Sequence, residues 1–313
     1  MSEQNFYLEL VSKMTVKLGP EEEIQLDTNV IKNNGVVRKA VTIGKNGSSV
    51  RPTIYLENYY AKYKDGLPMD IIIDKIIEIY HGAIKEAGES VVDFVKDWER
   101  VKDKIVFYLV SKERNKGNLD KHIYEDFCDL AAITVVHVTS GEKDIGSLHV
   151  TPEMLKCWGV SKAEVLEKAH VNTERLFPAE CFSITKMIMS MLGEEVAEVI
   201  GRTPCPVDLS ILSNKTGVMG ATVIMYEDFM KGIYQELQGK FIILPSSIHE
   251  VVIIPWEEGI DLENQRKMVS QINSEHIRDD EILSDNVYLY DGEKVVLVCG
   301  AEGVCSYEKG ERD

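Results

Sequence analysis

The sequence predicts an α+β protein. We expect a small antiparallel sheet with helices in the N-terminal part, and a mixed or antiparallel sheet with helices on one face in the C-terminal part. Short β-branched runs such as Phe241–Leu244 and Val251–Ile254 are typical of buried strands. Apolar residues at helical spacing recur between such runs, and Asn-Gly or Asp-Gly turn signals separate several of them.

The N-terminal region begins with an amphipathic segment at residues 1–18, for which we predict a helix. Two Asn-Gly pairs within residues 28–55 are strong turn signals, and three short antiparallel strands fit around them. Apolar residues then recur at helical spacing over residues 69–87, and again over residues 90–109 after a capping-box sequence. Two long helices are therefore predicted after the small sheet.

A strand, a loop and a returning strand are predicted over residues 131–150. His137 and His149 lie in matching His-Val-Thr triplets within these strands. Two histidines without further ligands at a set spacing are weak evidence for a metal site, because a structural zinc needs four ligands. We therefore expect ordinary half-buried histidines here, and no metal.

Residues 151–175 are predicted to form a pair of helices. Thr151 followed by Pro152 is a typical helix start, and Gly159 is placed to end this first helix. A capping-box sequence at Ser161 begins the second helix. This second helix carries acidic and basic residues in similar number, whereas a helix that faces phosphates is clearly basic. We therefore interpret the pair as structural rather than as a DNA-reading motif.

The clearest linker in the sequence is Thr203–Pro206, which contains two prolines in four residues. We place a domain boundary there, between an N-terminal domain of residues 1–203, which includes the helix pair, and a C-terminal domain of residues 204–313. The order predicted within the second domain is strand, strand, helix, strand, strand, helix and hairpin. The predicted strands before its first helix are Leu209–Ser213 and Gly220–Tyr226.

The composition limits the classes of partner. The formal net charge of −17 disfavours non-specific binding to nucleic acid or to an anionic membrane. No apolar run approaches the roughly 20 residues of a membrane span, and the N-terminus lacks the basic segment and apolar core of a signal peptide. The six cysteines are scattered without a C-x-x-C pair, so we predict six reduced thiols in a cytoplasmic protein.

The polar insert Pro245–Glu250, between two runs expected to be buried strands, is the densest cluster of chemically capable side chains. In an extended chain Ser247 and His249 share a face, while Glu250 points to the other. A serine nucleophile needs a base within hydrogen-bond reach, and the base needs an orienting partner. Ser247 and His249 could supply the first two groups, and Asp285 is the more plausible orienting group because Glu250 faces away.

Three interpretations of this insert remain open, namely a hydrogen-bonded structural turn, a ligand or partner site, and a catalytic site. The sequence lacks the G-x-S-x-G elbow, the H-E-x-x-H zinc motif and a P-loop, so no reaction is identified and no cofactor is expected. The candidate binding residues are Asn214, Lys215, Ser246, Ser247, His249, Glu250 and Asp285.

Several segments carry a family resemblance, most specifically L-P-S-S-x-H-E at residues 244–250 and N-T-x-x-L-F-P at residues 172–178. With LSNKTGVMGATVIMY and ILSDNVYLYD, they resemble an uncharacterised bacterial family, a domain of unknown function (DUF 5688), over roughly residues 5–290. The resemblance implies cytoplasmic proteins often found near mobile genetic elements, and no known activity, cofactor or catalytic residue.

A weaker similarity runs to a second uncharacterised bacterial family, which shares the W-G-[VL]-S helix pair and a later Pro-Ser turn. In that family the turn continues with Arg-Asp, whereas here it continues with Ser247-Ile248-His249-Glu250. No site residue is therefore carried over from it.

We predict a soluble, cytoplasmic bacterial protein that binds a ligand or partner, with enzymatic activity left open. One alternative is a hydrolase that uses Ser247 and His249. Another is an acidic regulator or inhibitor of a basic, nucleic-acid-binding protein, because residues 257–285 hold nine acidic against three basic side chains. Direct binding to nucleic acid and binding to a membrane are not expected.

Overall fold

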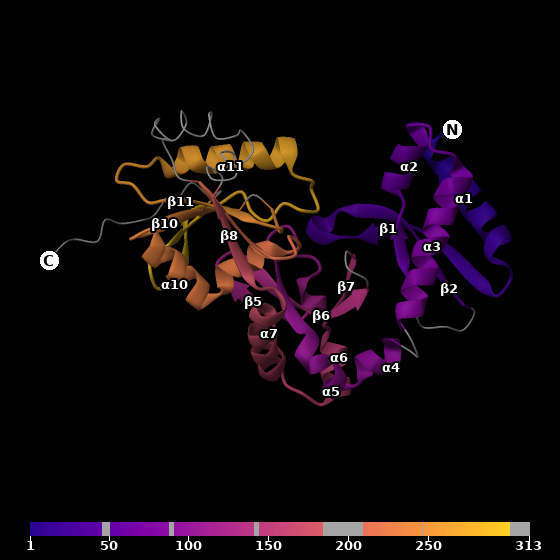
Figure 1. Cartoon of the computed structure of the whole chain (residues 1–313), viewed down its shortest axis with the longest axis horizontal. Helices are drawn as coiled ribbons and strands as arrows, with labels where there is room; N and C mark the ends of the chain where they lie inside the picture. Colours follow the sequence, from indigo (N-terminus) through magenta and orange to yellow (C-terminus); the bar gives the residue numbers. More distant parts are fainter. Residues whose placement is uncertain (46–50, 88–90, 141–143, 184–208, 246, 301–313) are drawn as a thin grey trace, which may run out of the picture.

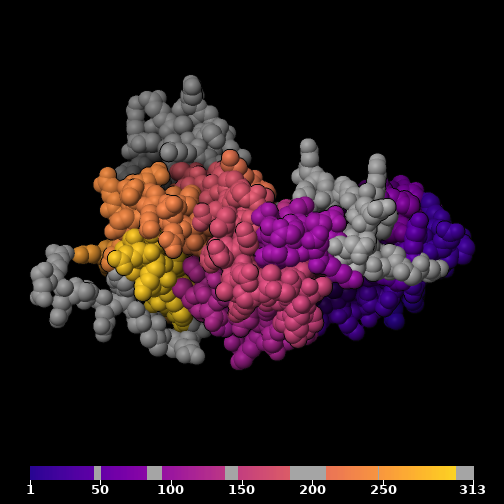
Figure 2. Space-filling view, turned by 90° about the horizontal axis from the view of Figure 1, so that it is seen from below, coloured from indigo at the N-terminus to yellow at the C-terminus, as the bar shows by residue number. Residues whose placement is uncertain are grey.

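The computed structural model describes residues 1–45, 51–87, 91–140, 144–183, 209–245 and 247–300. These residues form three antiparallel sheets, of three, four and six strands, together with helices, so the predicted α+β class is confirmed. The three-stranded sheet and its helices lie at one end of the molecule and the six-stranded sheet lies at the other (Figures 1 and 2). The four-stranded sheet lies between them.

The N-terminal unit packs helices on the three-stranded sheet, whose strand order is β1-β2-β3. Helical spacing places Phe6, Leu10 and Met14 on one face of α1, where they are fully buried against Ile72 and Ile76 of α3. Its elements are α1 (Glu3–Leu18), β1 (Glu22–Ile31), η1 (Asn33–Gly35), β2 (Val37–Lys45), β3 (Thr53–Tyr55), α2 (Glu57–Lys64) and α3 (Met69–Ala87).

The central sheet has β6 in its middle, with β4 on one side and both β5 and β7 on the other. All residues of β4 are buried: Phe107 and Leu109 face the main core of the molecule, and Tyr108 and Val110 face a smaller cluster on the opposite side. Its strands are β4 (Ile105–Ser111), β5 (Tyr124–Phe127), β6 (Leu130–Ser140) and β7 (Asp144–His149), and η3 (Leu119–Lys121) precedes β5.

The helix predicted over residues 90–109 is wrong beyond residue 104. Two short helices and a 3-10 turn lead into β4 instead. A run that is apolar at every position fits a buried helix and a buried strand equally well, and pairing with β6 decides for the strand. The short elements are α4 (Val91–Lys96), α5 (Trp98–Val101) and η2 (Lys102–Lys104).

The predicted helix pair is present as α6 (Pro152–Trp158) and α7 (Lys162–Leu176). Thr151 caps α6, and Ser161 with Glu164 forms the capping box of α7. Helix α7 packs on β4, where Thr173 Oγ1 accepts a hydrogen bond from the Phe107 N–H at 2.9 Å. The contacts of α7 with the sheet favour the structural interpretation of the pair.

Trp158→Ala is expected to lower the free energy of unfolding by about 2 kcal/mol. The half-buried indole of Trp158 packs on Trp98 with ring centroids 5.5 Å apart, and its Nε1–H donates to the Val95 carbonyl at 2.7 Å. Chemical denaturation measures the loss, and Trp158→Phe should recover the ring-packing part of it. A Trp158→Ala variant as stable as the wild type would contradict this packing role.

The six-stranded sheet has the order β13-β12-β10-β11-β9-β8, and all neighbours are antiparallel. Ile242 of β10 pairs with Ile254 of β11, so the two predicted apolar runs are neighbouring strands. The strands are β8 (Ala179–Ser183), β9 (Ser210–Asn214), β10 (Phe241–Leu244), β11 (Val251–Pro255), β12 (Val287–Tyr290) and β13 (Val295–Cys299).

Helices α10 (Glu227–Glu236) and α11 (Leu262–His276) cover opposite faces of this sheet, which differs from the expected placement on one face (Figure 1). Met230 of α10 packs in the cluster that contains Phe241, whereas Val269 of α11 packs in the cluster that contains Ile242. Neighbouring residues of a strand face opposite sides, and both sides of β10 are apolar, so each side needs a helix.

The strand predicted at residues 220–226 is a 3-10 helix, η4 (Gly220–Met225). Met219 precedes it in the left-handed conformation, with φ of 53°, which turns the chain out of the extended direction. Four of the five η4 residues from Gly220 to Ile224 are apolar or glycine, and all five are buried, so the segment has the composition of a strand without forming one.

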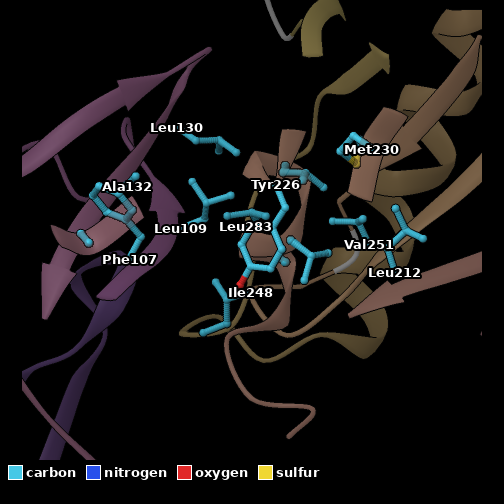
Figure 3. Close-up of a cluster of buried hydrophobic side chains, with 14 of the residues drawn as sticks. Phe107, Leu109, Leu130, Ala132, Leu212, Tyr226, Met230, Ile248, Val251 and Leu283 are labelled. Atoms are coloured by element: carbon cyan, nitrogen blue, oxygen red, sulfur yellow. The ribbon is translucent and has the colours of Figure 1, made fainter. Parts of the chain in front are cut away.

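One hydrophobic core joins the central sheet to the six-stranded sheet. Phe107 and Leu109 lie in the same buried cluster as Leu212, Tyr226 and Val251 (Figure 3). Strand β8 pairs with β9, so the six-stranded sheet contains strands from both sides of the expected domain boundary. The boundary residues themselves lie outside the described residues, and the division into two domains stays a prediction.

Cys128, Cys157 and Cys181 are free, whereas Cys299 is disulfide-bonded. The prediction that all six cysteines are reduced is therefore wrong for Cys299, and sequence spacing alone carries no information about pairing. Cys205 and Cys305 lie outside the described residues. Among the helices that the structure describes, none is long and apolar enough to cross a membrane.

Candidate functional site

The loop between β10 and β11 is closed by its own polar side chains. The Ser247 hydroxyl donates to Glu250 Oε1 at 2.9 Å and accepts a hydrogen bond from the His249 backbone N–H at 3.0 Å. The Ser247 N–H also donates to the Glu250 carbonyl at 3.3 Å. Ser247 is buried, so its hydroxyl serves the loop that holds His249 in place.

The ring of His249 is held between two neighbours. Its Nδ1 accepts a hydrogen bond from the Met219 N–H at 3.2 Å, which leaves the ring proton on Nε2 in the neutral form. The Nε2 atom lies 3.6 Å from Glu281 Oε1. Because His249 Nδ1 is used by Met219 and the Ser247 hydroxyl by Glu250, the two side chains do not form a nucleophile–base pair.

His249 lines a cavity of about 600 Å³ at the place where the three sheets meet. Its side chain is 26% exposed, so one side of the ring faces this space. The N-terminal unit contributes Lys32 and Tyr55, and the central sheet contributes Tyr108. Side chains that are distant in the sequence thus face one hollow.

A histidine pair forms part of the cavity wall. His122 Nε2 lies 3.3 Å from His149 Nδ1 and 3.3 Å from Asn118 Nδ2, and the two rings meet edge to face. Burial lowers the pKa of His122, and neighbouring Lys121 lowers it further. Desolvation of the ring likewise lowers the pKa of His149, and neighbouring His122 lowers it further. Both rings are therefore neutral near pH 7.

Two polar atoms of the cavity wall are buried without a hydrogen-bond partner in the described part of the protein. They are the Tyr108 hydroxyl and Nδ1 of His122. An unpaired buried polar group costs about 1–3 kcal/mol, so native proteins rarely retain one without a reason. Burial raises the pKa of Tyr108 to about 12, so its hydroxyl keeps its proton.

The charged groups of the cavity wall are mostly paired. Asp280 is bonded to Arg38 and to Arg278, each at 2.9 Å, and Glu281 lies 3.2 Å from Arg278. Lys32 instead lies over the Tyr55 ring, with Nζ 3.9 Å from the centroid. Burial lowers the pKa of Lys32, with Asp280 acting in the opposite direction.

A family model described as "Family of unknown function (DUF5688)" matches residues 3–292, which is most of the chain. The chain belongs to the DUF5688 family. No curated protein and no solved structure matches it. The sequence resemblance to this family is thus confirmed.

In this DUF5688 protein, Glu281 lies beside His249 in the place where Asp285 was expected. Asp285 is instead bonded to Arg114 and to Asn273, each at 2.9 Å, and its hydrogen bonds fix the start of the segment before β12. The sequence did not indicate Glu281 as a neighbour of His249, because Glu281 belongs to a charged turn that is distant from the insert along the chain. The loop contact between the Ile248 N–H and the Glu281 carbonyl, at 2.8 Å, brings them together.

The other predicted site residues have local roles or lie outside the described residues. Asn214 organises the turn after β9, because its Oδ1 accepts from the Thr216 N–H at 3.0 Å and its Nδ2 donates to the Val218 carbonyl at 2.9 Å. Lys215 is exposed, and its backbone N–H donates to Pro178 at 3.0 Å. Ser246 lies outside the described residues.

Sequence reasoning missed Lys32, Tyr108 and His122 as site residues of the DUF5688 protein. Tyr108 was assigned to the apolar stripe of a helix, and alternation within β4 would have separated it from Phe107 and Leu109. Lys32 and His122 carry no local signal, because the cavity forms only when the three sheets pack.

The histidines do not form a metal site with their acidic neighbours. In the residues that the structure describes, no three His, Cys, Asp or Glu side chains are grouped so that they could hold a metal ion. His137, which the sequence pairs with His149 by its triplet, packs its ring against Phe177 with centroids 5.1 Å apart. The partner of His149 is His122 instead.

Proposed function

We propose that this DUF5688 protein is a binding protein whose ligand is a small molecule held in the cavity between the three sheets. Pockets for small molecules have volumes of about 300–1,000 Å³, lie preferentially between domains and combine apolar walls with a few polar groups. The cavity of about 600 Å³ has this size and position. Two residues of its wall, Tyr108 and His122, each hold a buried polar atom without a hydrogen-bond partner in the described structure, and this is the observation that carries the proposal.

Cytoplasmic location, bacterial origin and a link to mobile genetic elements are part of this proposal. The resemblance to this family is the support for all three. The cysteines add none, because Cys128, Cys157 and Cys181 are free whereas Cys299 is disulfide-bonded.

The contacts of the site favour small-molecule binding over the two alternatives. A hydrolase using Ser247 would need that hydroxyl beside the His249 ring, but it is bonded to Glu250. An acidic regulator would present unpaired carboxylates, whereas four of the nine acids of residues 257–285 are paired with arginines of the same chain, namely Glu263, Asp280, Glu281 and Asp285.

Ser147→Trp is expected to abolish ligand retention. Ser147 lines the cavity and is exposed, so an indole at this position fills the space with little change to the core. Leu148→Trp is the matched control, because the next residue of β7 points to the opposite face and is 42% exposed.

The protein is incubated with a cell-free metabolite extract, separated by rapid gel filtration and denatured, and the released compounds are identified by mass spectrometry. We expect at least one compound to be carried by the wild type and by Leu148→Trp, and to be absent from Ser147→Trp. Equal retention by all three proteins, or no retained compound, would contradict the proposal.

A further inference from the structure

The unpaired atom of Tyr108 is a hydrogen-bond donor. Tyr108 is 5% exposed, lies on the cavity side of β4 and has a pKa raised to about 12 by burial, so the phenol retains its hydrogen at neutral pH. A phenol oxygen can also accept a hydrogen bond. Here, however, the O–H has no acceptor among the described residues, so an acceptor on a ligand would offset the free-energy cost of burying it.

The unpaired atom of His122 is also a donor. The Asn118 Nδ2 group, as its amide is oriented here, can only donate, so His122 Nε2 accepts from it at 3.3 Å. A neutral imidazole with an accepting Nε2 carries its proton on Nδ1. His149 Nδ1 lies 3.3 Å from the same nitrogen, where it shares the single lone pair with Asn118 as a second, weaker donor. The buried Nδ1–H of His122 then has no acceptor among the described residues.

Lys32 adds a positive charge at the same cavity. Among the described residues it has no carboxylate at ion-pair distance, because the nearby Asp280 is bonded to Arg38 and Arg278. The Glu281 carboxylate is likewise engaged by Arg278. The residues that line the cavity therefore hold two buried neutral donors and one cation, while the carboxylates of the wall are paired with arginines of this chain.

We propose that the cavity recognises an oxyanion group, a carboxylate or a phosphate, on a small molecule, through Tyr108, His122 and Lys32. This inference rests on the proposed small-molecule function. The rest of the wall includes Val110, Ile133 and Ile248, which suit an apolar body attached to the acid group. A negatively charged oxygen is the acceptor that forms the strongest hydrogen bonds with such donors.

The test uses three acids, each with a neutral partner of similar shape: benzoate with benzamide, octanoate with octanamide, and phenyl phosphate with phenol. Binding to the full-length protein is measured by isothermal titration calorimetry. We expect at least one acid to bind ten-fold or more tightly than its neutral partner, because a hydrogen bond to a charged group is stronger than one to a neutral group. Comparing the carboxylates with phenyl phosphate identifies which acid group is preferred.

Three variants assign the binding to the proposed residues. Tyr108→Phe should weaken binding of the acid by about ten-fold and raise the melting temperature of the free protein, because a buried unpaired hydroxyl is removed. Lys32→Met should weaken binding of the acid and not of its neutral partner. Lys45→Met, which removes an exposed lysine outside the cavity, should leave binding unchanged.

Neutral partners that bind as tightly as the acids would overturn the oxyanion inference and leave the small-molecule function standing. Failure of all six compounds to bind would overturn the inference as well, while the extract experiment with Ser147→Trp decides separately on the function. A Tyr108→Phe variant with a lower melting temperature and unchanged affinity would show that the hydroxyl serves the fold and would also overturn it.

Discussion

Gly220→Ala is expected to lower the free energy of unfolding by about 3 kcal/mol, at the upper end of the range for overpacked sites. A Cβ on Gly220 would lie closer than 3.0 Å to Ser213 Oγ, to the His249 carbonyl oxygen and to the Asn214 backbone nitrogen. Two of these atoms belong to the backbone of β9 and of the His249 loop. The Ser213 hydroxyl and the His249 carbonyl oxygen are joined by a hydrogen bond of 2.8 Å, so moving either of them away from the new Cβ would strain this bond.

Gly232→Ala is the matched control for this prediction. Gly232 lies inside α10, and a Cβ there would meet no atom within 4 Å, so alanine should raise stability by about 0.5–1 kcal/mol through its helix propensity. Urea denaturation of both variants gives the two changes, which are expected to have opposite signs. A Gly220→Ala variant as stable as the wild type would show that η4 does not press against the loop.

The elements with local signals were predictable from the sequence. Helices α6 and α7 follow from their caps at Thr151 and Ser161, and β10 and β11 follow from two β-branched runs that end near prolines. The predictions for the segments that form β4 and η4 were wrong, because an apolar run indicates burial without distinguishing a helix from a strand. Pairing with β6 in one case, and the left-handed Met219 in the other, decided the conformation.

The candidate site was predictable only in part for the same reason. The sequence located His249 because a polar insert between two buried strands stands out, and that residue does line the cavity. Its neighbour Glu281, and the donors Tyr108 and His122, come from separate elements whose meeting depends on tertiary packing.

The packing that closes the cavity depends on contacts of η1 with the turn before β12. The Asn34 side chain donates to the Asp279 carbonyl at 2.8 Å and to the Ile282 carbonyl at 2.7 Å, and Asn33 donates to the Asp280 carbonyl at 2.9 Å. Asn115 of the central unit donates to the side-chain oxygens of both asparagines, at 2.9 and 3.1 Å. This cluster joins all three sheets at one edge of the cavity.

Asp280→Ala is expected to lower the free energy of unfolding by about 3 kcal/mol. The Asp280 side chain is 4% exposed and binds Arg38 of β2 and Arg278 of its own turn, so its removal leaves Arg38 without its partner and Arg278 with Glu281 alone. Asp279→Ala is the control: its side chain is exposed and its carbonyl, which Asn34 uses, is retained, so a change below about 0.5 kcal/mol is expected.

The same carboxylate predicts a pH dependence. Burial acts to raise the pKa of Asp280, but the hydrogen bond and charge of Arg278, with Arg38, outweigh burial and hold the pKa below its ordinary value of 3.8. A group with a lowered pKa in the folded state stabilises the protein above its ordinary pKa and loses this contribution as the pH falls through the folded value. The difference in the free energy of unfolding between the wild type and Asp280→Asn, here called the stability gap, should therefore be largest at pH 6 and should shrink below about pH 3.8. Urea denaturation across this range measures the gap, and a gap that stays constant into the acid range would show that Asp280 is not the charged centre of the contact.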